Sequence, residues 1–138
     1  MRKSILIVSL SVIIGISGCK KEKSNPTALI TGKWHWVEQV YDGYTNNQLT
    51  SHEDYTATLD PLSYFEFDAD GKFIENPQDK NGSFKYGTYQ LQGDSLIIND
   101  SGDISRWAIK TLSSSSLVIH ETTGESPYRG EVTYSMKK

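Results

Sequence analysis

The sequence predicts an all-β domain of eight antiparallel strands, arranged as an up-and-down barrel or as a two-sheet sandwich. From residue 30 onward apolar and polar side chains alternate, and no segment keeps the i, i+3, i+4, i+7 spacing of an amphipathic helix. Short turns rich in Gly, Asn, Asp and Ser separate the alternating segments. A barrel is favoured because its closure removes the sheet edges that a sandwich would leave exposed.

The first 18 residues are predicted to be a lipoprotein signal peptide. Arg2 and Lys3 precede an uncharged apolar run that ends at Ile16, and small residues lie before Cys19. The run is shorter than the roughly 20 apolar residues of a membrane-spanning helix. The sequence ISGC resembles the lipobox of bacterial lipoproteins, which implies that Cys19 carries diacylglycerol and an acyl chain. An ordinary buried or free thiol is the alternative.

Residues 19–28 are predicted to be the lipidated cysteine and a flexible tether, because KKEKSNP is polar and charged. Several acyl chains on Cys19 would anchor the protein stably, whereas one chain holds only weakly. We therefore expect an exported protein that is anchored in the cell envelope. Lys20 after the cysteine is compatible with the outer membrane of a gram-negative bacterium.

The composition restricts what the domain at 29–138 can do. Cys19 is the only cysteine, so no internal disulfide can form and the core must stabilise the domain alone. The formal net charge of the full chain is −3, which argues against nucleic acid as a partner, because phosphates need clustered Lys and Arg. We expect a monomer, and no protein partner can be named.

Eight strands are expected in the domain, each bounded by turn residues such as DADG, NG, GD, SGD, SSS and TGESP. They are predicted at 32–41, 62–67, 72–75, 84–91, 95–99, 104–111, 116–121 and 128–136. The longest irregular stretch is predicted at 42–61. A loop longer than about 12 to 15 residues is uncommon and often functional, so this stretch is the expected lid.

The sequence GKW at 32–34 is similar to the G-x-W motif on the first strand of lipocalins. YFEFDADGKF at 64–73, YGTYQLQGDSLII at 86–98 and LSSSSLVI at 112–119 accompany it. Together they resemble the small lipocalin-like lipoproteins of Bacteroidetes-type bacteria. This resemblance implies an eight-stranded lipocalin-like barrel with an apolar pocket, whose floor is built by Gly32 and Trp34.

One feature departs from the lipocalin pattern. Lipocalins usually place an arginine late in the last strand, across the first-strand tryptophan, whereas Lys137 and Lys138 occupy that place here. Either Lys137 replaces the arginine or the closed end is built differently. Arg129 lies at the other end of the last strand, far from Trp34 in an up-and-down barrel.

Alternation assigns the side chains of the first strand to two faces. Trp34, Trp36, Glu38 and Val40 are expected to point inward, and His35, Gln39 and Tyr41 outward. The expected inward residues of the other strands are Phe65, Phe67, Phe73, Tyr89, Leu91, Leu96, Ile98, Trp107, Ile109, Leu117, Ile119, Val132, Tyr134 and Met136. Among these residues we expect a ligand to contact Trp36, Tyr89, Trp107 and Tyr134, which are large and aromatic.

No catalytic or metal-binding signature stands out. The sequence has no G-x-S-x-G motif, no cysteine free to act as a nucleophile and no HExxH or paired-cysteine spacing. We therefore expect no catalysis, no metal and no cofactor, and a small hydrophobic or amphipathic ligand in the barrel. The alternative is an envelope protein with a filled barrel that binds or inhibits a protein, or binds a glycan, through loops such as 42–61. A weak hydrolase is the third alternative.

Overall fold

The computed structural model describes residues 25–76 and 84–138. The signal peptide predicted at 1–18, Cys19 and the NG turn at 81–82 lie outside them. The described chain forms one short helix, one 3-10 helix and nine strands. They are α1 (Pro26–Ile30), β1 (Gly32–Thr45), β2 (Gln48–Asp54), η1 (Thr56–Thr58), β3 (Tyr64–Phe67), β4 (Lys72–Asn76), β5 (Lys85–Gln92), β6 (Ser95–Asp100), β7 (Asp103–Leu112), β8 (Ser116–Glu125) and β9 (Tyr128–Lys137).

Eight of the strands close into an antiparallel barrel, which confirms the predicted barrel over the sandwich. Each of β3 to β8 pairs with the next strand along the chain, and β9 then pairs with β1. That last pairing extends from His35 opposite Lys137 to Thr45 opposite Tyr128. One edge of β1 is therefore paired with β9, and its other edge is shared by β3 and β2.

The predicted loop at 42–61 is wrong, because much of this stretch is strand. β1 continues to Thr45, and β2 returns antiparallel to it, joined by a turn in which Asn46 and Asn47 adopt positive φ. Asparagine tolerates this left-handed conformation, and paired positive φ values are typical of tight hairpins. The sequence does not reveal the hairpin because β2 has a single apolar residue, Leu49, and therefore shows no alternation of apolar and polar residues.

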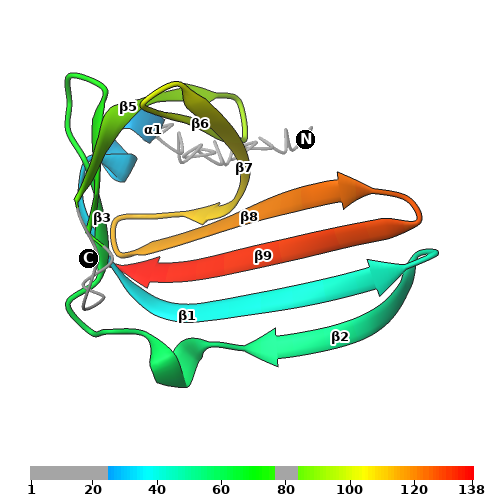
Figure 1. Cartoon of the computed structure of the whole chain (residues 1–138). Coiled ribbons are helices and arrows are strands. Elements are labelled where there is room, and N and C mark those ends of the chain that lie inside the picture. The colour runs from blue at the N-terminus through cyan, green and yellow to red at the C-terminus, as the bar shows by residue number, and fades with distance from the viewer. Residues whose placement is uncertain (1–24, 77–83) are drawn as a thin grey trace, which may run out of the picture.

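β1, β2, β8 and β9 run together beyond the curled strands β3 to β7 (Figure 1). We call the part of this sheet formed by residues 39–45, 48–54, 121–125 and 128–133 the arm. The tips of its two hairpins are joined by a hydrogen bond from the backbone N–H of Asn46 to the carbonyl oxygen of Pro127, at 2.8 Å. The arm is thus a four-stranded extension of the barrel wall.

A β-bulge at Val37 changes which side chains of β1 face inward. Trp36 lies opposite Met136 and Glu38 lies opposite Ser135, so Val37 has no partner in the ladder. The predicted inward positions of Glu38 and Val40 and the outward position of Gln39 are therefore wrong. One extra residue in a strand moves every later side chain to the opposite face of the sheet. The pattern of apolar and polar residues alone cannot reveal such a bulge.

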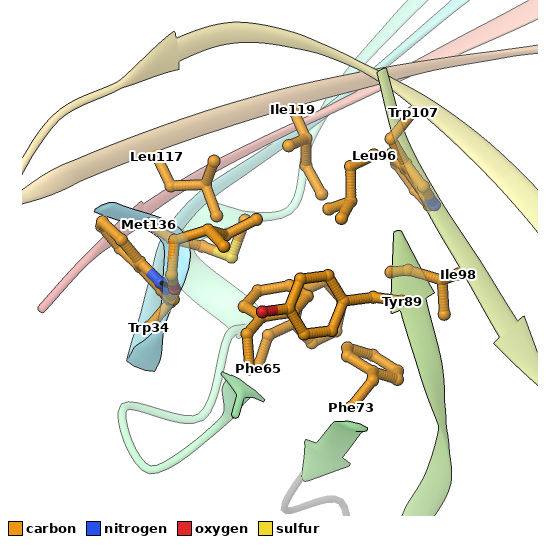
Figure 2. Close-up of a cluster of buried hydrophobic side chains, with 12 residues drawn as sticks. Trp34, Phe65, Phe73, Tyr89, Leu96, Ile98, Trp107, Leu117, Ile119 and Met136 are labelled. Carbon is orange, nitrogen blue, oxygen red and sulfur yellow. Dashed lines mark hydrogen bonds between the residues drawn. The ribbon is translucent and has the colours of Figure 1, made fainter. Parts of the chain in front are cut away.

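The core lies at the closed end of the barrel and in its middle (Figure 2). Alternation predicted most of its buried side chains, namely Trp34, Phe65, Phe67, Phe73, Tyr89, Leu96, Ile98, Trp107, Leu117, Ile119 and Met136. Leu91, Ile109 and Tyr134 are partly buried against this cluster. The core also contains Ile30, which α1 contributes and which no strand pattern could identify.

Trp34 and Lys138 close the floor of the barrel. The indole Nε1 of Trp34 donates a hydrogen bond of 2.6 Å to the carbonyl oxygen of Ile30. The Lys138 ammonium lies 4.6 Å from the centre of the Trp34 ring and donates to the carbonyl oxygen of Leu29 at 2.8 Å. Lys138, rather than Lys137, thus lies across the tryptophan. Gly32 leaves room for it, since a Cβ there would come within 3.2 Å of Lys138 Cε.

Candidate functional site

A cavity of about 420 Å³ lies at the end of the barrel opposite Trp34 and opens to solvent. Its floor is apolar and aromatic, formed by Phe65, Phe73, Ile98, Trp107, Val132 and Tyr134. Its rim is mostly polar, formed by Gln39, Glu75, Lys85, Asp100, Asp103, Ser105 and Glu121 together with the exposed Ile104. The strands place these groups together because β3, β5 and β7 begin at this end and β4 and β6 end there, whereas β1, β8 and β9 pass it and continue into the arm.

Tyr134 lies at the centre of the floor. Its ring centre is 5.5 Å from that of Trp107, 6.2 Å from that of Phe65 and 5.3 Å from that of Trp36. None of these pairs is a parallel stack, and tilted arrangements of this kind are favoured by the charge distribution of aromatic rings. The floor therefore presents several aromatic rings to the cavity.

Two polar groups of the floor are held by hydrogen bonds. The amide Nε2 of Gln39 donates to the Tyr134 hydroxyl at 3.2 Å, and Nε1 of Trp107 donates to Oγ of Ser105 at 3.0 Å. The Tyr134 hydroxyl accepts in this bond, so its own proton can be donated to a ligand. Burial raises the pKa of Tyr134 to about 12, with further contributions from the charges of Glu75 and Glu121.

The rim carries more negative than positive groups. Glu75, Asp100, Asp103 and Glu121 line it, with Lys85 as the single cation among the described lining residues. Lys85 already forms an ion pair of 3.2 Å with Glu75. Burial raises the pKa of Glu121 above its ordinary value.

The four residues predicted to contact a ligand occupy different places. Trp107 and Tyr134 line the cavity. Trp36 lies behind Tyr134 and packs edge-on against Phe65. Tyr89 is buried in the core, where its hydroxyl donates a 2.7 Å hydrogen bond to the carbonyl oxygen of Asp68 at the closed end. The structure thus brings Trp36, Trp107 and Tyr134 together and places Tyr89 apart from them.

Sequence reasoning missed the rim of the cavity, including two side chains that the barrel strands turn inward, Gln39 and Glu121. Gln39 faces inward only because of the bulge at Val37. Glu121 faces inward because it lies opposite Val132, on the same face as Ile119 opposite Tyr134. Counting two residues on from the buried Ile119 would have identified Glu121, whereas no sequence signal identifies Gln39.

Trp36 also borders a second hollow, of about 260 Å³, on the side of the barrel. It lies where the chain leaves β2 and crosses to β3, and Tyr55, Leu59 and Ser63 line it together with Gln39. Nε1 of Trp36 is buried and has no hydrogen-bond partner among the described residues. Because Gln39 borders both spaces, its side chain separates the side hollow from the main cavity.

We searched the described residues for a metal site and for a membrane-spanning helix. Within 25–76 and 84–138, no group of three or more His, Cys, Asp or Glu side chains could hold a metal ion. The described lining of the main cavity contains no His or Cys. No helix in the described part of the chain is long and apolar enough to cross a membrane.

Comparison with known proteins places this geometry in a family. The family model described as a lipocalin-like domain matches residues 30–119. A lipocalin-like protein from Bacteroides uniformis has a similar crystal structure, with 17% identity and a TM-score of 0.51 over 79% of this chain and 97% of that chain. No curated protein matches the chain.

Two further crystal structures resemble the chain more distantly. One is an uncharacterized protein from Bacteroides eggerthii, with 16% identity and a TM-score of 0.49 over 79% of this chain and 98% of that chain. The other is the bovine lipocalin allergen Bos d 2, with 12% identity and a TM-score of 0.48 over 81% of this chain and 74% of that chain. On the match at 30–119 and the closed eight-stranded barrel, the chain belongs to the lipocalin-like domain family.

Proposed function

We propose that this protein is a lipid-anchored binding protein that holds one small hydrophobic or amphipathic molecule in the main cavity and catalyses no reaction. The cavity of about 420 Å³ carries this proposal, because ligand sites are typically clefts of roughly 300 to 1,000 Å³, and this one combines an apolar, aromatic floor with a polar rim. An eight-stranded barrel is wide enough to enclose one small ligand above a packed floor.

The chemistry of the lining supports binding rather than catalysis. The floor offers apolar area through Phe65 and Phe73 and a hydroxyl proton through Tyr134. Serine is present as Ser105, but its hydroxyl accepts a hydrogen bond from Trp107 and no histidine lines the described cavity to activate it. Lipocalin-type barrels are typically binding folds, so the family membership agrees with this reading.

Ligand binding can be tested on the intact protein made in its host. Native mass spectrometry of the purified protein should detect a co-purifying small molecule, and a solvatochromic apolar dye should bind with a stoichiometry of one. Trp107→Ala should weaken dye binding, whereas His35→Ala, on the outer face of β1, should leave it unchanged. If neither a native ligand nor the dye binds, the proposal is wrong.

The lipid anchor is a separate part of the proposal and has its own test. It rests on the signal-like residues 1–18 and on the position of Cys19 directly after them. Metabolic labelling with palmitate should label the wild-type protein and fail to label Cys19→Ser. Fractionation of the cells should place the wild-type protein in the outer membrane, and an unlabelled protein in the soluble fraction would contradict the anchor.

A further inference from the structure

The geometry points to a positively charged amphiphile as the ligand of the main cavity: an apolar group on the aromatic floor and an ammonium at the rim. This inference rests on the proposed binding function and adds the sign of the ligand's charge. Three features of the cavity carry it. They are the balance of charge at the rim, the unpaired state of Glu121, and the aromatic faces below it.

The charge at the rim is negative on balance. Glu75, Asp100, Asp103 and Glu121 line the cavity together with one cation, Lys85. Lys85 and Glu75 form an ion pair of 3.2 Å, which has no net charge as a pair. The other three carboxylates have no cation opposite them among the described lining residues, so the potential at the mouth is negative.

Glu121 is the carboxylate best placed to meet a ligand. It has no hydrogen bond or ion pair with any residue in the described ranges. Its side chain is partly buried on the cavity wall opposite Val132, and burial raises the pKa of its carboxyl group. Partial burial without a partner disfavours the charged form of a carboxylate, and a ligand cation would supply the missing partner.

The aromatic residues of the floor can contact a cation as well as an apolar group. Tyr134 and Trp107 both line the space beneath the rim, with ring centres 5.5 Å apart and a tilt of 57° between the rings. Aromatic faces attract ammonium groups, and tryptophan and tyrosine do so most strongly. The charges of Glu75 and Glu121 also raise the pKa of Tyr134, which means that the negative potential of the rim reaches the floor.

The test uses three probes of equal chain length and different charge: octyltrimethylammonium, octanol and octanoate. Calorimetric titration of the intact protein at low ionic strength should give the tightest binding for the ammonium probe, about tenfold tighter than for octanol. Octanoate should bind most weakly. Added salt should weaken binding of the ammonium probe and leave octanol unaffected.

Glu121→Gln should weaken binding of the ammonium probe about three- to tenfold and leave octanol binding unchanged, since glutamine keeps the shape and removes the charge. Glu66→Gln is the matched control, because Glu66 pairs with Lys33 on the outer face and lies outside the cavity. Asp103→Asn supplies a second rim variant if Glu121→Gln does not fold.

Three outcomes separate the inference from the function on which it rests. Tightest binding of the ammonium probe, lost selectively in Glu121→Gln, supports the inference. Equal binding of all three probes, or equal effects of Glu121→Gln and Glu66→Gln, overturns the charge preference and leaves a neutral binding cavity. Failure of all three probes, together with the dye, overturns the proposed function itself.

Discussion

At the scale of the single residue, Tyr134 connects the apolar and polar parts of the cavity. Its ring packs against Trp36 and Trp107, and its hydroxyl accepts a hydrogen bond from Gln39. The same hydroxyl lies within the field of two rim carboxylates, Glu75 and Glu121. The environment of this one side chain therefore depends on the burial of the floor, on the position of Gln39 and on the charge of the rim.

Tyr134 should make stability fall at high pH. Its pKa is about 12 in the folded protein, whereas the tyrosine of an unfolded chain ionises near pH 10. The folded state holds this proton longer, so the free energy of unfolding should decrease as the pH rises from about 10 to about 12. Urea unfolding should show wild type losing about 2 kcal/mol more than Tyr134→Phe over this range. Equal losses in the two proteins would contradict the raised pKa.

Lys138 should stabilise the closed end through Trp34. Lys138→Met removes the ammonium from the Trp34 ring and the hydrogen bond to Leu29, and should lower the free energy of unfolding by about 1 kcal/mol. Lys137→Met is the control, because no contact holds the exposed Lys137 side chain among the described residues, and it should change stability by less than about 0.5 kcal/mol. Equal effects of the two variants in urea unfolding would exclude a specific role for Lys138.

At the scale of the element, β1 connects all parts of the molecule. Its first half lies between β9 and β3 in the barrel, and its second half lies between β9 and β2 in the arm. The bulge at Val37 separates the two halves and sets the inward direction of Gln39 in the cavity. The strand therefore determines both where the barrel ends and which polar group reaches its floor.

Close approach of β5 and β6 at Gly87 gives a prediction about strand pairing. A Cβ on Gly87 would overlap the backbone carbonyl oxygen of Asn99, so Gly87→Ala must push the two strands apart. We expect a loss of at least about 2 kcal/mol in urea unfolding. Gly130→Ala is the control, because its Cβ would meet only the side-chain ends of Tyr41 and Thr123, at 2.9 Å. Gly130→Ala should lower the free energy of unfolding less than Gly87→Ala does. A larger loss in Gly130→Ala would contradict the importance of the close approach at Gly87.

Sequence reasoning located the strands of the barrel better than those of the arm. Barrel strands such as β5 and β6 contain apolar residues at every second position, as at Tyr89 and Leu91 or Leu96 and Ile98, so the core and the fold class could be predicted from them. β2 is exposed on nearly every residue and leaves no such pattern, so it was predicted as loop. At the site, Trp107 and Tyr134 were placed correctly on inward faces, whereas Gln39 depended on a bulge that alternation cannot show.

At the scale of the whole molecule, a packed barrel and a thin arm share one sheet. Most of the buried apolar side chains lie in the barrel half, and the arm contributes mainly polar residues. Its outer face carries an ion pair of 3.0 Å between Arg129 and Glu131, and Arg129 also lies over the ring of Tyr44. The arm is therefore held by strand pairing and polar contacts, and the barrel by its core.

Hydrogen exchange should distinguish these two halves. β2 pairs only with β1, and residues 121–125 of β8 pair only with β9, so each has one open edge in the described structure. Their amides should exchange earlier than those of β6 and of residues 134–137 in β9, which border the core. Mass spectrometry of peptides from each strand would measure this difference. Uniform protection would show that arm and barrel open as one unit.

The pairing of β1 with β9 also governs the order in which the chain can fold. The edge of β1 that pairs with β9 stays unpaired until residues 128–137 have left the ribosome, because no other described strand pairs with it. Contacts between such distant parts of a chain form slowly, and an unpaired strand edge invites association with other chains. The barrel can therefore close only after synthesis of β9.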